Sequence, residues 1–132
     1  MYFVYYSSPV TSNTKKLAES VNRQGNFQAI VQPVGFNYPQ DKTILFVPSY
    51  GGNNSFVVPP QVKEYLNKWG EERKLVCGVV ATGNRNFGSN FCAGGAQVAR
   101  KLNVPLLGTA ELAGQPQEID NIIKSIRVLG LV

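Results

Sequence analysis

The sequence predicts an α/β fold in which a five-stranded parallel sheet carries helices on both faces. Short apolar runs rich in β-branched residues alternate along the chain with segments of helical periodicity, and this alternation produces right-handed crossovers between parallel strands. The chain has 132 residues, of which 43% are hydrophobic, enough for one core and too few for two. We therefore expect a single domain over residues 1–132.

The first half of the chain is predicted to contain three strands and one helix. In order, these are a strand over residues 3–6, a helix that begins at Ser12 or Asn13 and ends near Gly25, and strands over 27–34 and 43–48. Leu17, Ala18 and Val21 form the inner face of the helix. Pro33 places the second strand at a sheet edge, because proline lacks a backbone donor. Residues 35–42 have no helical period, which indicates an irregular crossover.

The second half is predicted to contain three helices and two strands. They are a helix from Pro59 or Pro60 to Gly70, a strand over 75–82, a helix over 91–102, a short strand over 103–107 and a helix over 116–129. Trp69 follows Val62, Tyr65 and Leu66 at helical spacing, so we expect it to pack rather than to stack on a ligand. Small residues in the 91–102 helix allow close packing on the sheet.

Composition excludes several classes of function. Histidine is absent, which removes His-based catalysis and nearly every zinc site, and no metal site is predicted. Cys77 lies in an apolar run and is expected to be a buried strand thiol. The net charge of +5 is scattered, so nucleic-acid binding is disfavoured and an acidic protein partner is the more interesting interpretation. The N-terminal apolar run is too short for a signal peptide, and no segment approaches the roughly 20 apolar residues of a membrane span. We expect a cytoplasmic protein with no membrane contact.

Three polar loops each follow a predicted strand directly. They span residues 7–14, 49–55 and 82–88, and consist mainly of glycine, asparagine and hydroxyl residues. The five strands suit the flavodoxin-like order 2-1-3-4-5, a three-layer sandwich that binds its ligand at the switch between the first and third strands. Loops at the carboxyl ends of these strands indicate one ligand with a phosphate end and a flat polar end. This combination predicts a flavin.

The first loop is predicted to hold the phosphate. Helix N-terminal amides and converging hydroxyls can bind a phosphate without any lysine. The candidate ligands are Ser7, Ser8, Thr11, Asn13 and Thr14. Ordinary turn and cap chemistry is the alternative interpretation, although it would need only one or two of these residues.

The second and third loops are predicted to hold the flavin ring. Tyr50 could stack on the ring, and the peptide at Gly51 or Gly52 could turn to accept the proton of flavin N5. In the third loop, amides at the far edge of the ring would come from Gly83, Asn84, Asn86 and Gly88. Phe87 borders the ring or packs under the loop. Ser49 and Thr82, which open these two loops, complete the expected cofactor site; no side chain is assigned a catalytic role.

Competing phosphate motifs fail when they are tested against the sequence. No G-x-G-x-x-G follows the first strand, which excludes a dinucleotide fingerprint. Residues 83–88 have P-loop spacing, but Ser89 and Asn90 replace the required lysine and hydroxyl residue. The C-x5-R motif of low-molecular-weight tyrosine phosphatases is also absent, because Ser7 stands at that turn.

Charge in the loops indicates which flavin state they favour. The three loops contain no Asp or Glu, and Arg85 is their only ionisable charge. Since nearby carboxylates would disfavour an anionic, fully reduced flavin, we expect the two-electron-reduced state to be accessible here. An Arg85 that faces solvent and tunes nothing is the alternative.

Several motifs together resemble the NrdI family, the flavodoxin-like activators of class Ib ribonucleotide reductase. They are Val-Pro-Ser-Tyr-Gly-Gly at 47–52, Val-Pro-x-Gln-Val at 58–62, Ala-Thr-Gly-Asn-Arg-Asn-Phe-Gly at 81–88, Val-Ala-Arg-Lys at 98–101 and Val-Pro at 104–105. The resemblance extends from Val4 to Gly114. The sequence departs from the pattern in a first loop one residue longer and in a second loop that continues Asn-Asn-Ser-Phe instead of glycine.

The resemblance implies an FMN protein that acts with protein partners rather than as a turnover enzyme. In that family the reduced flavin reacts with dioxygen, and the superoxide or peroxide reaches the dimetal small subunit of the reductase. There it oxidises a dimanganese centre and generates the tyrosyl radical. A flavin reductase would supply the electrons. Two alternatives remain open: a general electron-transfer flavodoxin, and a cofactor-free module that binds another phosphate compound.

Overall fold

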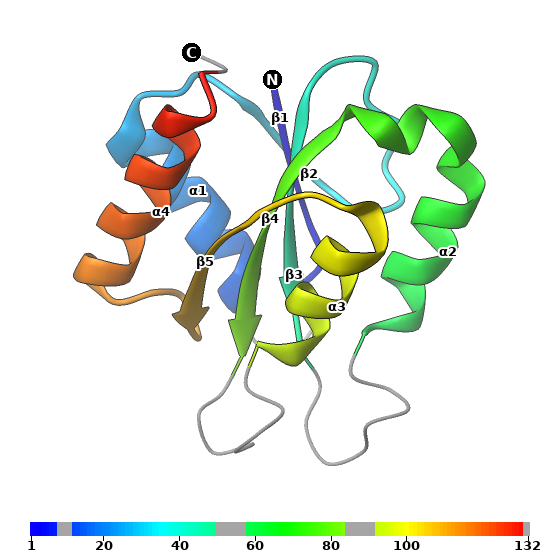
Figure 1. Ribbon diagram of the computed structural model, residues 1–132. Coiled ribbons are helices and arrows are strands. Elements are labelled where there is room, and N and C mark those ends of the chain that lie inside the picture. Colours follow the sequence, from blue (N-terminus) through cyan, green and yellow to red (C-terminus); the bar gives the residue numbers. More distant parts are fainter. Residues whose placement is uncertain (8–11, 50–57, 84–91, 131–132) are drawn as a thin grey trace.

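The computed structural model describes residues 1–7, 12–49, 58–83 and 92–130, and its centre is one five-stranded sheet (Figure 1). The strands are β1 (Tyr2–Tyr5), β2 (Ile30–Pro33), β3 (Thr43–Pro48), β4 (Val76–Gly83) and β5 (Leu106–Glu111). Their order is β2-β1-β3-β4-β5, and every neighbouring pair is parallel. The predicted fold class and strand order are confirmed.

Helices cover both faces of the sheet. They are α1 (Asn13–Gly25), α2 (Pro60–Trp69), the 3₁₀ helix η2 (Gly70–Leu75), α3 (Ala93–Leu102) and α4 (Pro116–Val128). The pair α1 and α4 lies on one face, and the pair α2 and α3 lies on the other (Figure 1). Of the helices that the described part of the chain contains, none is long and apolar enough to cross a bilayer.

The side chains of alternate strand residues pack into two separate hydrophobic cores, one on each face of the sheet. On β3, Ile44 and Phe46 pack with the inner faces of α1 and α4. Leu45 and Val47, which point to the opposite face, pack with α2 and α3. All four side chains are at most 1% exposed, as expected for the central strand of a parallel sheet buried on both sides. The near-continuous apolar run at 43–48 is the sequence signature of this position.

The predicted fifth strand was misplaced. The sequence placed it over residues 103–107, but β5 begins at Leu106 and continues to Glu111. Asn103 has a left-handed backbone (φ 56°) and ends α3, so the chain cannot enter the sheet there. Gly108 and the exposed Thr109 interrupt the apolar pattern of the true strand, which is why periodicity alone missed it.

The other strands differ from prediction mainly in their bounds. β2 is shorter than the expected 27–34, because Gln28 takes a left-handed backbone (φ 57°) and the Asn22 side chain bonds the backbone of Ala29. β2 does lie at the sheet edge, as Pro33 predicted, and residues 34–42 cross to β3 without a helix. Cys77 lies on β4 but is only partly buried, since its side chain lies at the margin of the core, where its thiol donates to the Leu75 carbonyl (3.3 Å).

Three aromatic rings from α2 and the β2–β3 crossover pack together. Tyr38 stacks on Tyr65 at a ring-centroid distance of 5.0 Å, and Trp69 lies 5.7 Å from Tyr65. Trp69 is 5% exposed, which confirms its predicted packing role. The Tyr65 hydroxyl donates to the Asn37 carbonyl, so α2 is tied to the crossover.

Alkaline pH is expected to destabilise the protein through Tyr65. Burial, followed by the repulsion of Tyr38, raises the pKa of Tyr65 from 10 to about 12. Above pH 10 the unfolded chain loses this phenolic proton while the folded chain keeps it, so stability falls through the window between pH 10 and 12. Thermal unfolding from pH 8 upward should show a shallower alkaline decline in Tyr65→Phe than in the unmodified protein. Parallel declines would contradict the assignment.

Candidate cofactor site

The carboxyl ends of β1, β3 and β4 bring polar residues to one edge of the sheet, the lower edge in Figure 1. Ser7 follows β1, Ser49 follows β3, and Thr82 lies at the end of β4, directly paired with Pro48. Because β1 and β3 are neighbours while β2 lies on the far side of β1, this edge contains the topological switch point of the sheet. The sequence predicted a ligand site at this position.

The N-terminus of α1 is capped from outside the helix. The sequence predicted a cap by Ser12 or Asn13; Ser12 occupies the N-cap position, but with a left-handed backbone (φ 55°) and no side-chain cap bond. Instead, the Lys15 amide donates to Ser7 Oγ (2.7 Å). The first turn of α1 carries no acidic residue, so the partial positive charge of the helix end is not compensated there. Such an end favours an anion.

A buried hydroxyl pair joins α1 to β4. Thr14 Oγ1 and Thr82 Oγ1 are 3.0 Å apart, and the two residues are 4% and 2% exposed. Either hydroxyl can donate to the other. Whichever does, the bond uses one of the two hydroxyl protons, so the pair retains one proton for another acceptor.

Ser49 fixes the start of α3. Its Oγ accepts the amide of Gly94 (2.7 Å), and its own amide donates to the Thr82 carbonyl (3.0 Å). Ser49 is 5% exposed. Its hydroxyl oxygen therefore positions the start of α3 at this edge. The sequence interpretation assigned Ser49 to the cofactor and did not foresee this role.

A second helix begins at this edge; the sequence predicted the helix, over 91–102, but gave its N-terminus no part in the site. Like α1, α3 begins at a residue with a left-handed backbone, Cys92 (φ 58°), which makes no side-chain cap bond. Its first turn also lacks acidic residues. Two helices thus direct the positive ends of their dipoles toward the same edge. The Gly-Gly pair at 94–95 after a polar loop was the available signal.

Two carboxylates near the edge were also missed. Glu111 ends β5 and is paired with Gly83, the last residue of β4. Glu118, in the first turn of α4, accepts the amides of Glu111 (3.3 Å) and Gln115 (2.9 Å). The three loops contain no Asp or Glu, but the neighbouring end of β5 does carry a carboxylate.

The described part of the predicted site is brought together. It comprises Ser7, Asn13, Thr14, Ser49, Thr82 and Gly83. The remaining predicted residues lie outside the described residues: Ser8, Thr11, Tyr50, Gly51, Gly52, Asn84, Arg85, Asn86, Phe87 and Gly88. Among the described residues no cluster of three or more potential metal ligands occurs.

The donor set fits a phosphate-bearing cofactor. Ser7 Oγ already accepts an amide, so its proton is free to point elsewhere. The Thr14–Thr82 pair offers another proton, and the N-terminus of α1, which has no acidic residue in its first turn, adds a positive field. Hydroxyls and helix amides hold phosphate without a charged side chain, and these groups converge at the switch point where such sheets bind their ligands.

Sheet order and switch-point site together define a flavodoxin-like protein. The flavodoxin of Streptococcus pneumonia TIGR4 superposes with a TM-score of 0.68 at 15% sequence identity, covering 98% of this chain and 96% of that one. This likeness concerns the fold.

The sequence comparison is more specific: residues 4–124 match the family model described as NrdI flavodoxin-like, and the chain belongs to that family. Protein NrdI of Mycoplasmopsis pulmonis is 36% identical over 124 residues, which cover 91% of this chain and 80% of the relative. Protein NrdI of Beutenbergia cavernae is 39% identical over 117 residues, covering 88% and 83%. The flavodoxin-like fold and the family together imply a flavin cofactor.

Proposed function

We propose that this protein binds FMN at the switch-point edge and acts as the redox activator of a class Ib ribonucleotide reductase. In this proposal, reduction of the bound flavin is followed by reaction with dioxygen, and the resulting superoxide or peroxide passes to the dimetal small subunit. There the oxidant assembles the dimanganese-tyrosyl radical cofactor. A flavin reductase is the proposed source of electrons, and the cytoplasm is the proposed compartment.

The arrangement of α1 carries the cofactor assignment. Ser7 replaces the missing side-chain cap of α1, and no acid occupies the first turn. A dianionic phosphate at this end would gain charge-assisted hydrogen bonds and the favourable helix dipole. FMN has such a phosphate, whereas riboflavin does not.

The described residues would bind and orient the cofactor. Ser7 and the Thr14–Thr82 pair would donate to the phosphate, while Ser49 holds the α3 end in place through Gly94. The bound flavin would supply the one- and two-electron chemistry. Residues 50–57 and 84–91 follow β3 and β4, and we propose that Tyr50, Gly51, Gly52, Asn84, Phe87 and Gly88 line the ring, with Gly51 and Gly52 near N5.

The deciding experiment measures radical assembly. The FMN-loaded protein is reduced anaerobically, mixed with the manganese-loaded small subunit and exposed to oxygen, and the tyrosyl radical is counted by electron paramagnetic resonance. Radical that depends on the reduced protein would support the proposal. If no radical forms while the protein reduces other acceptors, the general electron-transfer flavodoxin becomes the better assignment. A purified protein that binds no flavin would instead favour the cofactor-free module.

Replacing Ser7 by alanine should weaken FMN binding selectively. The variant loses one donor to the phosphate and the acceptor of the Lys15 amide, and we expect about a tenfold increase in the Kd for FMN. The Kd for riboflavin should change by less than about twofold, because riboflavin makes no phosphate contact. Fluorescence titration measures both constants, with Ser125→Ala on α4 as the matched control. Equal increases in the Kd values for FMN and riboflavin would contradict a role for Ser7 in phosphate binding.

A further inference from the structure

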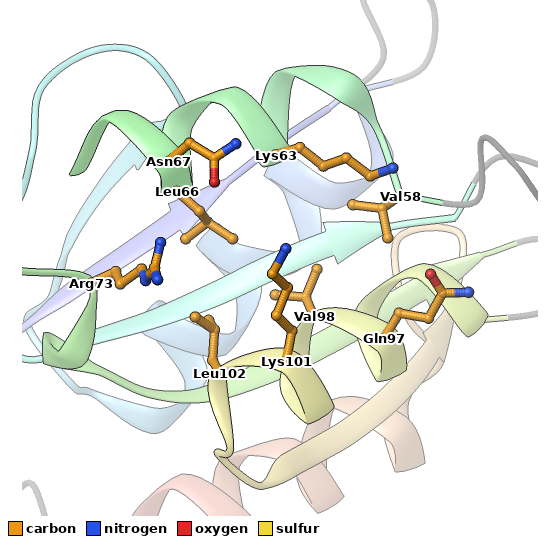
Figure 2. A pocket seen from close by; sticks show the side chains of 9 residues that line it. All are labelled: Val58, Lys63, Leu66, Asn67, Arg73, Gln97, Val98, Lys101 and Leu102. Atoms are coloured by element: carbon orange, nitrogen blue, oxygen red, sulfur yellow. The ribbon is translucent and has the colours of Figure 1, made fainter. Parts of the chain in front are cut away.

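A groove separates α2 and α3 on the face of the sheet opposite α1 and α4. It encloses about 380 Å³ and is formed by the end of the segment before α2, by α2 itself, by η2 and by α3 (Figure 2). Val58, Leu66, Val98 and Leu102 form an apolar floor. We call this the α2–α3 groove.

The rim of the groove is cationic. Lys63 on α2, Arg73 on η2 and Lys101 on α3 line it. Figure 2 shows the Lys101 side chain pointing from α3 toward α2, and the Lys63 side chain lying along α2 toward Val58. No acidic side chain is among its lining residues in the described part of the chain. The undescribed residues contain no Asp or Glu either, so they cannot add a carboxylate to it.

Arg73 and Lys101 lie in the last turns of η2 and α3, where a helix dipole favours a positive charge, but the three rim cations are not committed to ion pairs among the described residues. Elsewhere on the helices, Lys68 pairs with Glu64 (2.8 Å) and Lys124 pairs with Asp120 (2.9 Å). Lys63, in contrast, lies near the N-terminus of α2, where the helix dipole disfavours a positive charge and no acid offsets it. A cation kept in an unfavourable position indicates a role outside the fold.

The groove continues along the helices. Arg73, Lys101 and Leu102 are shared with a second hollow near the amino ends of the strands, whose lining also includes Lys74, Val104 and one carboxylate, Glu71. Its other end is lined by Val58, which precedes α2 in the chain. An elongated groove with an apolar floor and cations on both walls is complementary to a peptide segment with one apolar and one acidic face.

We propose that the α2–α3 groove is a docking site for an acidic, amphipathic segment of a partner protein. The segment's apolar side chains would contact Leu66 and Val98, and its carboxylates would meet Lys63 and Lys101. Nucleic acid fits less well, because the lining residues in the described part of the chain include no aromatic side chain on which bases could stack. The proposal is independent of the cofactor assignment, since it uses none of the residues at the switch-point edge.

Charge-neutralising variants test the groove against general surface charge. The groove variant carries Lys63→Gln, Arg73→Gln and Lys101→Gln. The control variant carries Arg23→Gln, Lys42→Gln and Lys124→Gln, all exposed and away from the groove, and has the same net charge. Both are used as the full-length chain in its cofactor-loaded form, and thermal unfolding verifies that both are folded.

The probe is a fluorescein-labelled helical peptide with leucines on one face and glutamates on the other, followed by anisotropy. A second peptide has serine in place of every leucine, and tripolyphosphate represents a small anion. We expect saturable binding of the amphipathic peptide, with the Kd raised about tenfold in the groove variant and less than about twofold in the control variant. The serine peptide should bind at least about tenfold more weakly.

Five outcomes would overturn the proposal. Equal loss in the two variants would mean that only net charge matters. Binding of the serine peptide or of tripolyphosphate as tight as that of the amphipathic peptide would indicate a small-anion site. An absence of saturable peptide binding, or self-association in sedimentation that only the groove variant abolishes, would leave the groove unused by such a partner or occupied by a second copy of the chain.

Discussion

Gly95→Ala is expected to lower the free energy of unfolding by about 2–3 kcal/mol, because α3 has no room for a methyl group where it crosses β4. A Cβ at this position would lie 2.4 Å from the Ala81 Cβ and 2.8 Å from the Ala81 Cα. The second of these atoms belongs to the backbone of a central strand and cannot rotate away. The helix must therefore move from the sheet, and urea unfolding followed by circular dichroism measures the cost.

Two further variants test this explanation. Arg100→Ala, an exposed change in the same helix, should shift stability by less than about 0.5 kcal/mol. Ala81→Gly removes the nearer of the two clashing atoms, so it should recover part of the loss when it is combined with Gly95→Ala, although it destabilises β4 alone. Additive losses in the double variant would show that Gly95 and Ala81 do not limit the approach of α3.

The fold was largely predictable because its strongest signals are local. Apolar runs at 43–48 and 75–82 mark strands buried on both faces, and Pro33 marks the edge. The failure at β5 has a physical origin: only Leu107 and Ala110 are buried in this edge strand, so Gly108 and the exposed Thr109 interrupt its apolar pattern, while Asn103 ends the preceding helix. Pattern analysis is weakest where a strand is only half-buried.

The location of the candidate site could be predicted from the sequence, but the roles of its residues could be predicted only in part. Hydroxyl residues after three strands identified the edge, since parallel strands end together there. Which of them meets a ligand depends on partners distant in sequence. Thr14 pairs with Thr82 across 68 residues, and Ser49 meets Gly94 across 45, and no local pattern encodes either contact. Glu111 was overlooked for the same reason, since its place beside Gly83 follows from strand register.

Ser49 links the fold to the candidate site, because its hydroxyl holds the start of α3. Removing this hydroxyl should therefore affect both stability and cofactor binding. Ser49→Ala deletes the acceptor of the buried Gly94 amide (2.7 Å) without enlarging the side chain. A buried amide without a partner costs about 1–3 kcal/mol, so we expect a loss of stability in that range. Ser125→Ala, which replaces a serine on α4, should change stability by less than about 0.5 kcal/mol.

Faster hydrogen exchange at the start of α3 is the measurement that specifically reports the loss of this hydrogen bond. The Gly94 amide should exchange faster in Ser49→Ala than global destabilisation alone explains, while amides in the middle of α3, such as Val98, should follow global stability. FMN affinity should fall as well, because residues 84–91 lead into the helix end that Ser49 holds. Unchanged Gly94 exchange would mean that water replaces the serine hydroxyl, and that the position of α3 depends on packing at Gly95 instead.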